Sequence, residues 1–148
     1  MKIRFAIGSD YNFLIEGLEK NRILENRAKK DIPAKESDKI EFKDAIKKKN
    51  IRIIEDKRKP VAFLYFRTDF KIMYIYEDFF WVDLIYVRED YRGKGLGKSL
   101  YNDAVKIAKK KGFKKIIIDI FDSNKNSIGF HKKLDFKPIY AIYKKNIA

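Results

Sequence analysis

The sequence predicts an α/β (α+β) sandwich in which helices cover both faces of a central mixed β-sheet. Three observations carry this prediction. Strand and helix patterns alternate along the chain, the run 79–87 is apolar on both faces like a covered central strand, and a glycine-rich turn joins that run to an amphipathic helix. With 148 residues and 45% hydrophobic content, the chain is sized for a single domain spanning 1–148.

The first half of the chain predicts two helices and three strands. Alternating apolar residues favour strands, and Ser or Asp residues before apolar stripes of helical spacing favour capped helices. The expected elements are a strand at 2–7, a helix capped by Ser9 or Asp10, a polar loop at 26–36, a helix capped by Ser37 that ends near Asn50, and a hairpin of 51–55 and 61–67. The segment 68–78 fits either a longer strand or an aromatic loop carrying Phe70, Tyr74 and Tyr76.

The second half predicts strands and helices in alternation. The helix after the glycine turn carries an apolar stripe and stops at Gly112, a residue suited to a helix end. The expected elements are a central strand at 79–87, that helix, a buried strand at 115–120, a helix at 127–134 and a last strand at 137–144.

Composition excludes several classes of function. The chain has no Cys and one His, so a disulfide framework, a cysteine nucleophile and a two-histidine metal motif are excluded, and no metal site is expected. No run approaches the roughly 18 to 20 apolar residues of a membrane span, so a soluble, cytoplasmic protein without membrane contact is expected. The formal charge of +14 invites a nucleic-acid interpretation. The basic residues occur in short scattered runs, which favours solvated helix ends and turns over a binding stripe.

The stretch from Val87 to Gly97 predicts an anion site. An apolar strand runs into three glycines that open a helix, so backbone N–H groups and the positive helix end can face a phosphate. Arg92 and Lys94 add positive charge to the same turn. A Walker loop requires Gly at position 92, and a Rossmann fingerprint requires a different glycine spacing, so both interpretations fail.

Two segments, in this order, resemble signatures of the GNAT superfamily of acetyl-CoA-dependent N-acetyltransferases. Arg92, Gly95 and Gly97 match its Arg-x-x-Gly-x-Gly pyrophosphate loop. Its C-terminal signature is matched in register by Asn124, Ser127, Phe130, Leu134 and Phe136. The chain departs from that signature at His131, where Tyr is usual, and at Asp135, where Gly is usual. Asp tolerates the left-handed conformation of a helix end, so the second departure is mild.

The resemblance implies a mostly antiparallel sheet splayed between two strands, with acetyl-CoA as the acyl donor. The pantetheine arm would lie between the splayed strands and bond the backbone of Ile85 and Val87. Asn124 would close on it from the other side, although an Asn there also suits a plain helix cap. The implied cofactor-binding residues are Ile85, Val87, Arg92, Gly93, Lys94, Gly95, Leu96, Gly97, Lys98, Asn124, Ser127 and Phe130.

The implied reaction is direct attack of an amine on the thioester, which requires a base. Asp119 interrupts one apolar strand and Asp83 another, and a carboxylate inside a strand is rarely idle. We expect Asp119 to be the base, with Asp83 second or acting through a water. Either carboxylate could instead pair with a Lys or Arg for structural reasons.

Two further roles follow from the resemblance. The N–H of Val87, at an expected β-bulge, would stabilise the oxyanion. His131 would protonate the leaving thiolate from the usual Tyr position, and its alternative is a half-buried helix residue beside Phe130.

The acceptor is expected to be an amine: a protein or peptide N-terminus, a lysine, or a small molecule. The alternative function is a non-catalytic module that senses acetyl-CoA or binds nucleic acid. Homodimer formation stays open.

Overall fold

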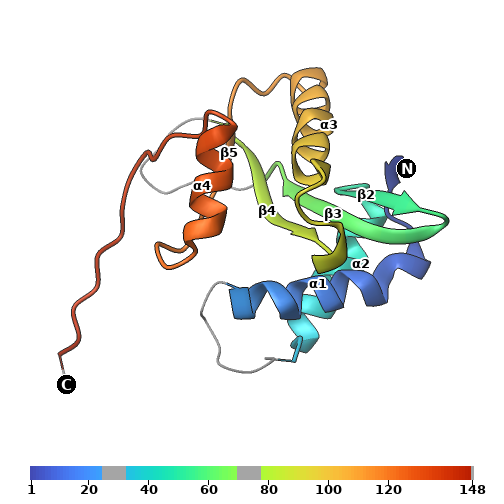
Figure 1. The fold of residues 1–148 in the computed structure, drawn as a ribbon, viewed down its shortest axis with the longest axis horizontal. Helices are drawn as coiled ribbons and strands as arrows, with labels where there is room; N and C mark the ends of the chain where they lie inside the picture. Colours follow the sequence, from blue (N-terminus) through green and yellow to red (C-terminus); the bar gives the residue numbers. More distant parts are fainter. Residues whose placement is uncertain (25–32, 70–77, 148) are drawn as a thin grey trace.

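The computed structural model describes residues 1–24, 33–69 and 78–147, which form a mixed sheet with helices on both faces (Figure 1). The strands are β1 (Lys2–Phe5), β2 (Ile51–Asp56), β3 (Lys59–Arg67), β4 (Phe80–Val87) and β5 (Ile116–Ile118), and the helices are α1 (Tyr11–Leu24), α2 (Glu36–Lys47), α3 (Leu96–Lys110) and α4 (Lys125–Lys133). The sheet order is β1-β2-β3-β4-β5, and every pair is antiparallel except the parallel pair β4–β5. The predicted fold class is confirmed.

Each face of the sheet buries its own apolar cluster. On one face, Phe66, Phe80 and Val82 pack under Leu100 of α3, and side chains at the end of α4 close the edge of this cluster. The cluster on the opposite face joins α1 and α2 to the sheet through Phe13, Leu14, Phe42, Phe63 and Tyr86. Because both faces are covered, β4 is apolar on both sides, as its sequence indicated.

A β-bulge in β4 exchanges the faces of its side chains. Tyr65 pairs with Leu84 but Phe66 pairs with Val82, so Asp83 is an extra residue that the β3–β4 ladder skips. Val82 lies in the cluster under α3, whereas Leu84 lies in the cluster under α1 and α2. The bulge therefore allows β4 to serve both clusters and re-aims the side chain of Asp83.

The sheet splays between β4 and β5. Their ladder joins Phe80, Trp81 and Val82 to the three residues of β5, and it stops there. Beyond Val82, within the described residues, β4 continues to Val87 with β3 as its only strand partner. The expected splay is thus present, and it begins at the bulged Asp83.

Three local expectations were wrong. Ser37 lies inside α2, whose start is stabilised by the Asp38 carboxylate accepting from the Lys35 N–H at 2.8 Å. The strand expected at 115–120 is only Ile116–Ile118. The last strand expected at 137–144 does not form, and that segment is exposed and without regular structure.

Some expectations lie wholly or partly outside the described residues. These are the middle of the loop at 26–36 and most of the segment 68–78, with Phe70, Tyr74 and Tyr76. Within the part of the chain that the structure describes, no helix is both long and apolar enough to span a bilayer.

Candidate active site

The glycine turn presents unpaired backbone N–H groups at the start of α3. Gly95 is the N-cap, with the left-handed φ of 80°, and no side chain caps the helix. The first helical bond runs from the Ser99 N–H to the Gly95 carbonyl at 3.0 Å, so the N–H groups of Leu96, Gly97 and Lys98 precede the ladder. Three N–H groups on a 15-residue helix, with its positive dipole end behind them, form a site for an anion.

Side chains hold this turn against the sheet. Arg92 donates from Nε to the carbonyl of Val87 at 3.0 Å, which ties the turn to the end of β4. The ammonium of Lys94 lies 5.0 Å from the centre of the Tyr91 ring, and the Tyr91 hydroxyl donates to Asp56 at 2.9 Å. The anion site is therefore fixed relative to β4 before any ligand arrives.

The glycines of the turn have different roles. A Cβ on Gly95 would meet nothing within 4 Å, so the space beside its backbone is open. A Cβ on Gly97 would lie 2.8 Å from the Phe130 ring, so Gly97 is required for the approach of α3 to α4. Gly95, and not Gly97, is therefore the position at which a substitution probes the anion site without disturbing packing.

The backbone of Ile85 and Val87 faces the splay. The Arg88 N–H donates to the Val61 carbonyl at 2.9 Å, which makes that pair a hydrogen-bonded one in the β3–β4 ladder. Because such pairs alternate in antiparallel sheets, Ile85 and Val87 direct their N–H and C=O groups away from β3. Val87 pairs regularly with Ala62, so the bulge expected at Val87 lies at Asp83 instead.

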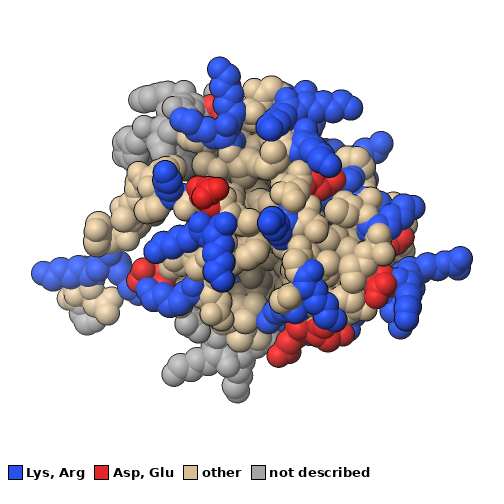
Figure 2. All heavy atoms as spheres, turned by 45° about the horizontal axis from the view of Figure 1, so that its top comes forward, with Lys and Arg blue, Asp and Glu red and all other residues tan. Residues whose placement is uncertain are grey.

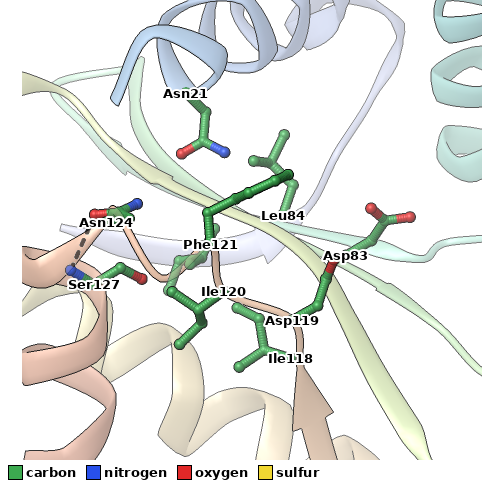
Figure 3. Close-up of a pocket in the computed structure, with 10 residues that line it drawn as sticks. Asn21, Asp83, Leu84, Ile118, Asp119, Ile120, Phe121, Asn124 and Ser127 are labelled. Carbon is green, nitrogen blue, oxygen red and sulfur yellow. Dashed lines mark hydrogen bonds between the residues drawn. The ribbon is translucent and has the colours of Figure 1, made fainter. Parts of the chain in front are cut away.

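A pocket opens where β4 and β5 diverge (Figure 3). Asn124 and Ser127 lie on one side of it in this view, joined by a hydrogen bond, and Asp83 and Asp119 lie on the other. The lining residues are Asn21, Asp83, Leu84, Ile85, Ile118, Asp119, Ile120, Phe121, Asn124 and Ser127. The pocket thus brings together five residues that the sequence singled out: Ile85, Asp83, Asp119, Asn124 and Ser127.

Asp83 is a carboxylate of this pocket whose pKa is raised. Burial and the negative charges of Glu41 and Asp119 raise its pKa to about 6, and Arg67 opposes this increase. Arg67 Nη1 lies 3.7 Å from Asp83 Oδ2, an ion pair long enough that burial and the neighbouring negative charges outweigh it. A carboxylate with this pKa is ionised at neutral pH and can accept a proton.

Asp119 lines the same pocket but is exposed. It follows β5 directly, beyond the last ladder pair, and its charge contributes to the raised pKa of Asp83. The two carboxylates therefore lie close enough for their charges to interact.

Asn124 caps α4 as well as lining the pocket. Its side-chain oxygen accepts from the Ser127 N–H at 3.2 Å, so the simpler role considered for it is present. Its location in the pocket wall leaves a ligand-binding role open to test.

His131 lies behind the pocket wall rather than in it. It is 2% exposed, with aromatic neighbours Tyr101, Phe130 and Phe136. Nδ1 is 2.7 Å from the carbonyl of Ser127, which requires an N–H there, so Nε2 accepts from the Tyr101 hydroxyl at 2.6 Å. Burial lowers the His131 pKa, in agreement with a neutral ring. Both ring nitrogens are engaged, and the acid role stays a prediction without geometric support.

A double-mutant cycle separates packing from catalysis at His131. The His131→Phe change leaves the buried Tyr101 hydroxyl without its acceptor, so we expect a loss of about 1–3 kcal/mol in the free energy of unfolding. Adding Tyr101→Phe removes the orphaned hydroxyl and should restore most of that loss, measured by urea denaturation. If turnover falls with His131→Phe and stays low when stability returns, His131 has a chemical role.

Sequence reasoning missed several residues around the pocket. Asn21 extends the spacing of Leu14 and Leu18 on α1, so a polar residue on an apolar stripe was an available signal. Phe121 carried no comparable signal in the sequence. Arg67 and Glu41 carried none either, because they lie on β3 and α2, far from Asp83 along the chain, and only folding brings them near it. Among the described residues, no cluster of three or more His, Cys, Asp or Glu side chains could hold a metal ion.

Positive charge is distributed over the surface. In the view of Figure 2, Lys and Arg side chains project across the whole visible face, with Asp and Glu between them. They do not gather into one stripe on that face, which agrees with the solvated-surface interpretation.

Comparisons with known proteins identify relatives for most of the chain. The model of the Acetyltransferase (GNAT) family matches residues 20–136. An uncharacterized N-acetyltransferase of Methanocaldococcus jannaschii is 40% identical over 53 residues, which are 36% of this chain and 24% of the relative. The aligned part is thus about a quarter of that relative's length.

Solved structures agree on the fold along the whole chain. A mutant of the Bacillus halodurans protein BH1408 superposes with a TM-score of 0.82 at 17% identity, covering 100% of both chains. An aminoglycoside antibiotic 6'-N-acetyltransferase of Acinetobacter haemolyticus superposes with a TM-score of 0.70 at 19% identity, again over 100% of both chains. The family model matches from within α1 to just past α4, and this chain therefore belongs to the GNAT family of acetyltransferases.

Proposed function

We propose that this chain transfers the acetyl group of acetyl-CoA directly to an amine. The observation that carries the proposal is the pocket at the β4–β5 splay. It joins a carboxylate of pKa about 6 to a free strand edge that leads to the anion site of α3. Family membership indicates the class of reaction, acetyl transfer. The pocket, the carboxylate and the anion site are the features that could bind the donor and activate the acceptor.

The residues present fit acetyl-CoA. The N–H groups of Leu96, Gly97 and Lys98 would hold the pyrophosphate, beside the open space at Gly95. The outward-facing backbone of Ile85 and Val87 would hydrogen-bond the pantetheine amides in the manner of a missing strand. Asn124 and Ser127 line the opposite side of the same pocket.

Asp83 is our proposed base, in preference to Asp119. Alkylammonium groups have a pKa near 10.4, so the acceptor amine must lose a proton before it can attack. A half-buried carboxylate with a pKa of about 6 suits that task, because proton transfer is most efficient when the base titrates near working pH. Asp119 is exposed to solvent, whereas Asp83 is partly shielded from it at the β4 bulge. Asp119 would then bind the incoming cation or act through a water.

The bond changes balance without an enzyme-bound intermediate. The ammonium first gives one proton to Asp83, which passes it to solvent, and the free amine nitrogen then forms the new bond to the acetyl carbon. The carbon–sulfur bond breaks to release CoA, and the second proton leaving the nitrogen is transferred, through Asp83 or water, to the thiolate, which becomes the thiol. An N–H on the outward-facing edge of β4, at Ile85 or Val87, would stabilise the oxyanion of the tetrahedral intermediate.

The acceptor is left as an amine of open identity. The curated relative aligns over only part of its length, and the solved structures share only the fold. The charge of +14 disfavours polycationic acceptors at a distance, whereas Asp83, Asp119 and the nearby Glu41 would favour a single ammonium group at the pocket.

A thiol-release screen tests the proposal. The protein and acetyl-CoA are incubated with peptides, free amino acids, polyamines and aminoglycosides, and CoA is measured with a thiol reagent. Because the chain has no Cys, the reagent reports CoA alone. We expect release with at least one amine class. No release with any amine, together with no thermal stabilisation by millimolar acetyl-CoA, would defeat the proposal. Tight oligonucleotide binding that weakens steeply with salt would favour the nucleic-acid module instead.

A further inference from the structure

The segment 137–147 is an extended and exposed tail that leaves the domain after α4. In Figure 1 it runs away from the five-stranded sheet. It carries large apolar side chains in the open, with Ile142 84% exposed and Tyr143 92% exposed. Ile and Tyr favour strands, and this run has no Gly or Asp to interrupt it. Its sequence is typical of a strand, but no strand among the described residues pairs with it.

The outer edge of β5 is the place in the sheet where such a strand could pair. β5 is the last strand in the order β1-β2-β3-β4-β5, and within the described residues its outer edge has no strand beside it. It is only three residues long, although another β-branched residue, Ile120, follows just beyond Asp119. An edge that offers unpaired N–H and C=O groups is a template for an added strand.

One physical cause would account for two departures from the sequence expectations. A strand was expected at 115–120 and another at 137–144, but the first is shortened to Ile116–Ile118 and the second does not form. A strand that lacks a neighbour on one side has fewer ladder hydrogen bonds to hold its ends. A missing partner strand would therefore both shorten β5 and leave the tail unpaired.

Local geometry directs the tail outward. Asp135 has a left-handed φ of 65°, and its N–H closes the end of α4 on the Lys132 carbonyl at 3.1 Å. Pro138 follows, which restricts Lys137 to extended conformations and opposes a tight return of the chain toward its own β5. The exposed run thus begins where the backbone is held pointing away from the domain.

We infer that the tail of one copy adds as a strand to the β5 edge of a second copy, and that two copies exchange tails in a symmetric dimer. The same chain supplies the unpaired strand and the unpaired edge, so a two-fold arrangement satisfies both at once. The exchange also covers the exposed Ile139, Tyr140, Ile142 and Tyr143.

The exchange would support the pocket of the partner. Ile118, Asp119, Ile120 and Phe121 follow one another at the end of β5 and line the pocket. A strand beside β5 would extend its ladder toward Ile120 and fix this wall, so activity should rise with dimer formation. This last consequence rests on the proposed function, whereas the exchange itself does not.

The oligomeric state is measured first. We expect sedimentation of the full chain to give a dimer. Ile142→Pro should convert it to a monomer, because Pro lacks the N–H of a ladder residue and is excluded from paired strands. Ile147→Pro is the matched control beyond the apolar run, and it should stay dimeric. A wild-type monomer at all concentrations, or a dimer unaffected by Ile142→Pro, would overturn the inference. A cooperative thermal transition in both variants, at a lower temperature for Ile142→Pro because the stabilisation from association is lost, would show that the domain remains folded.

Cross-linking separates exchange from a tail that folds back on its own sheet. Because the chain has no Cys, Lys114→Cys beside β5 and Ala141→Cys in the tail can be made in separate chains and mixed. A short bismaleimide should link the two different chains in the mixture. A chain carrying both changes should likewise give covalent dimers. An internal link in the doubly substituted chain, with no link in the mixture, would show that the tail returns to its own β5 and would reject exchange. Neither readout depends on acetyl transfer, so failure of the proposed function leaves this test intact.

Discussion

Replacing Asp83 with Asn is expected to lower kcat/KM by about a hundredfold or more, while acetyl-CoA binding is retained. The amide cannot take the proton of the acceptor amine, but its shape and its place in the bulge are preserved. For the wild type, log kcat/KM should rise with pH through an inflection near 6, where Asp83 loses its proton, and the Asp83→Asn variant should lack that inflection. Steady-state thiol release and acetyl-CoA titration measure the two quantities.

Asp119→Asn is the matched control for this result. It removes a carboxylate from the same pocket, and it also removes one of the charges that raise the Asp83 pKa. We therefore expect a smaller loss of kcat/KM and a shift of the inflection to lower pH. If Asp119→Asn is the inactive variant and Asp83→Asn turns over almost normally, the base lies after β5, as the sequence alone had suggested.

A second large effect is expected at the start of α3, where Gly95→Asp should abolish stabilisation by acetyl-CoA. A ligand present at 100 times its Kd stabilises the folded state by about 2.7 kcal/mol, which a thermal shift detects. Asp can adopt the left-handed conformation of Gly95, and its carboxylate would enter open space where the pyrophosphate is proposed to bind. Charge repulsion should then remove the shift, although the protein remains folded.

The same helix offers the control at its other end. Gly112 has a φ of 85° and, like Gly95, open space where a Cβ would lie, so Gly112→Asp carries the same backbone cost. It lies far along the chain from the anion site and should keep the full acetyl-CoA shift. Equal loss of the shift in both variants would mean that backbone strain, rather than phosphate recognition, explains the Gly95 result.

The parts of the fold that local chemistry determines could be predicted from the sequence. β4 and α3 were expected at nearly their observed limits, because a doubly apolar run, a glycine turn and a long apolar stripe are all short-range signals. The hairpin of β2 and β3 follows from its polar turn in the same way. Asp83, singled out as a carboxylate within an apolar strand, lines one pocket together with Ile85 and Asn124, which the family resemblance singled out.

The features that depend on pairing partners could not be predicted. Simple strand alternation would place Asp83 on the same face as Trp81 and Ile85. It could not predict that the pairing with β3 skips this residue and so forms a bulge. The pKa of Asp83 depends on Glu41 and Arg67, which are distant in sequence. His131 matched a catalytic position in register, yet its ring is used by Tyr101 and Ser127, and only the three-dimensional arrangement gives that result.

The contact between Gly97 and Phe130 has a consequence for how this chain can vary. Each residue belongs to a different signature, and the missing Cβ of one makes room for the ring of the other. A larger residue at 97 is therefore compatible with a smaller one at 130, whereas the first change alone would clash and the second alone would leave a cavity. Substitutions at these two positions should be tolerated as a pair, so that a library randomised at both would return complementary volumes instead of independent preferences.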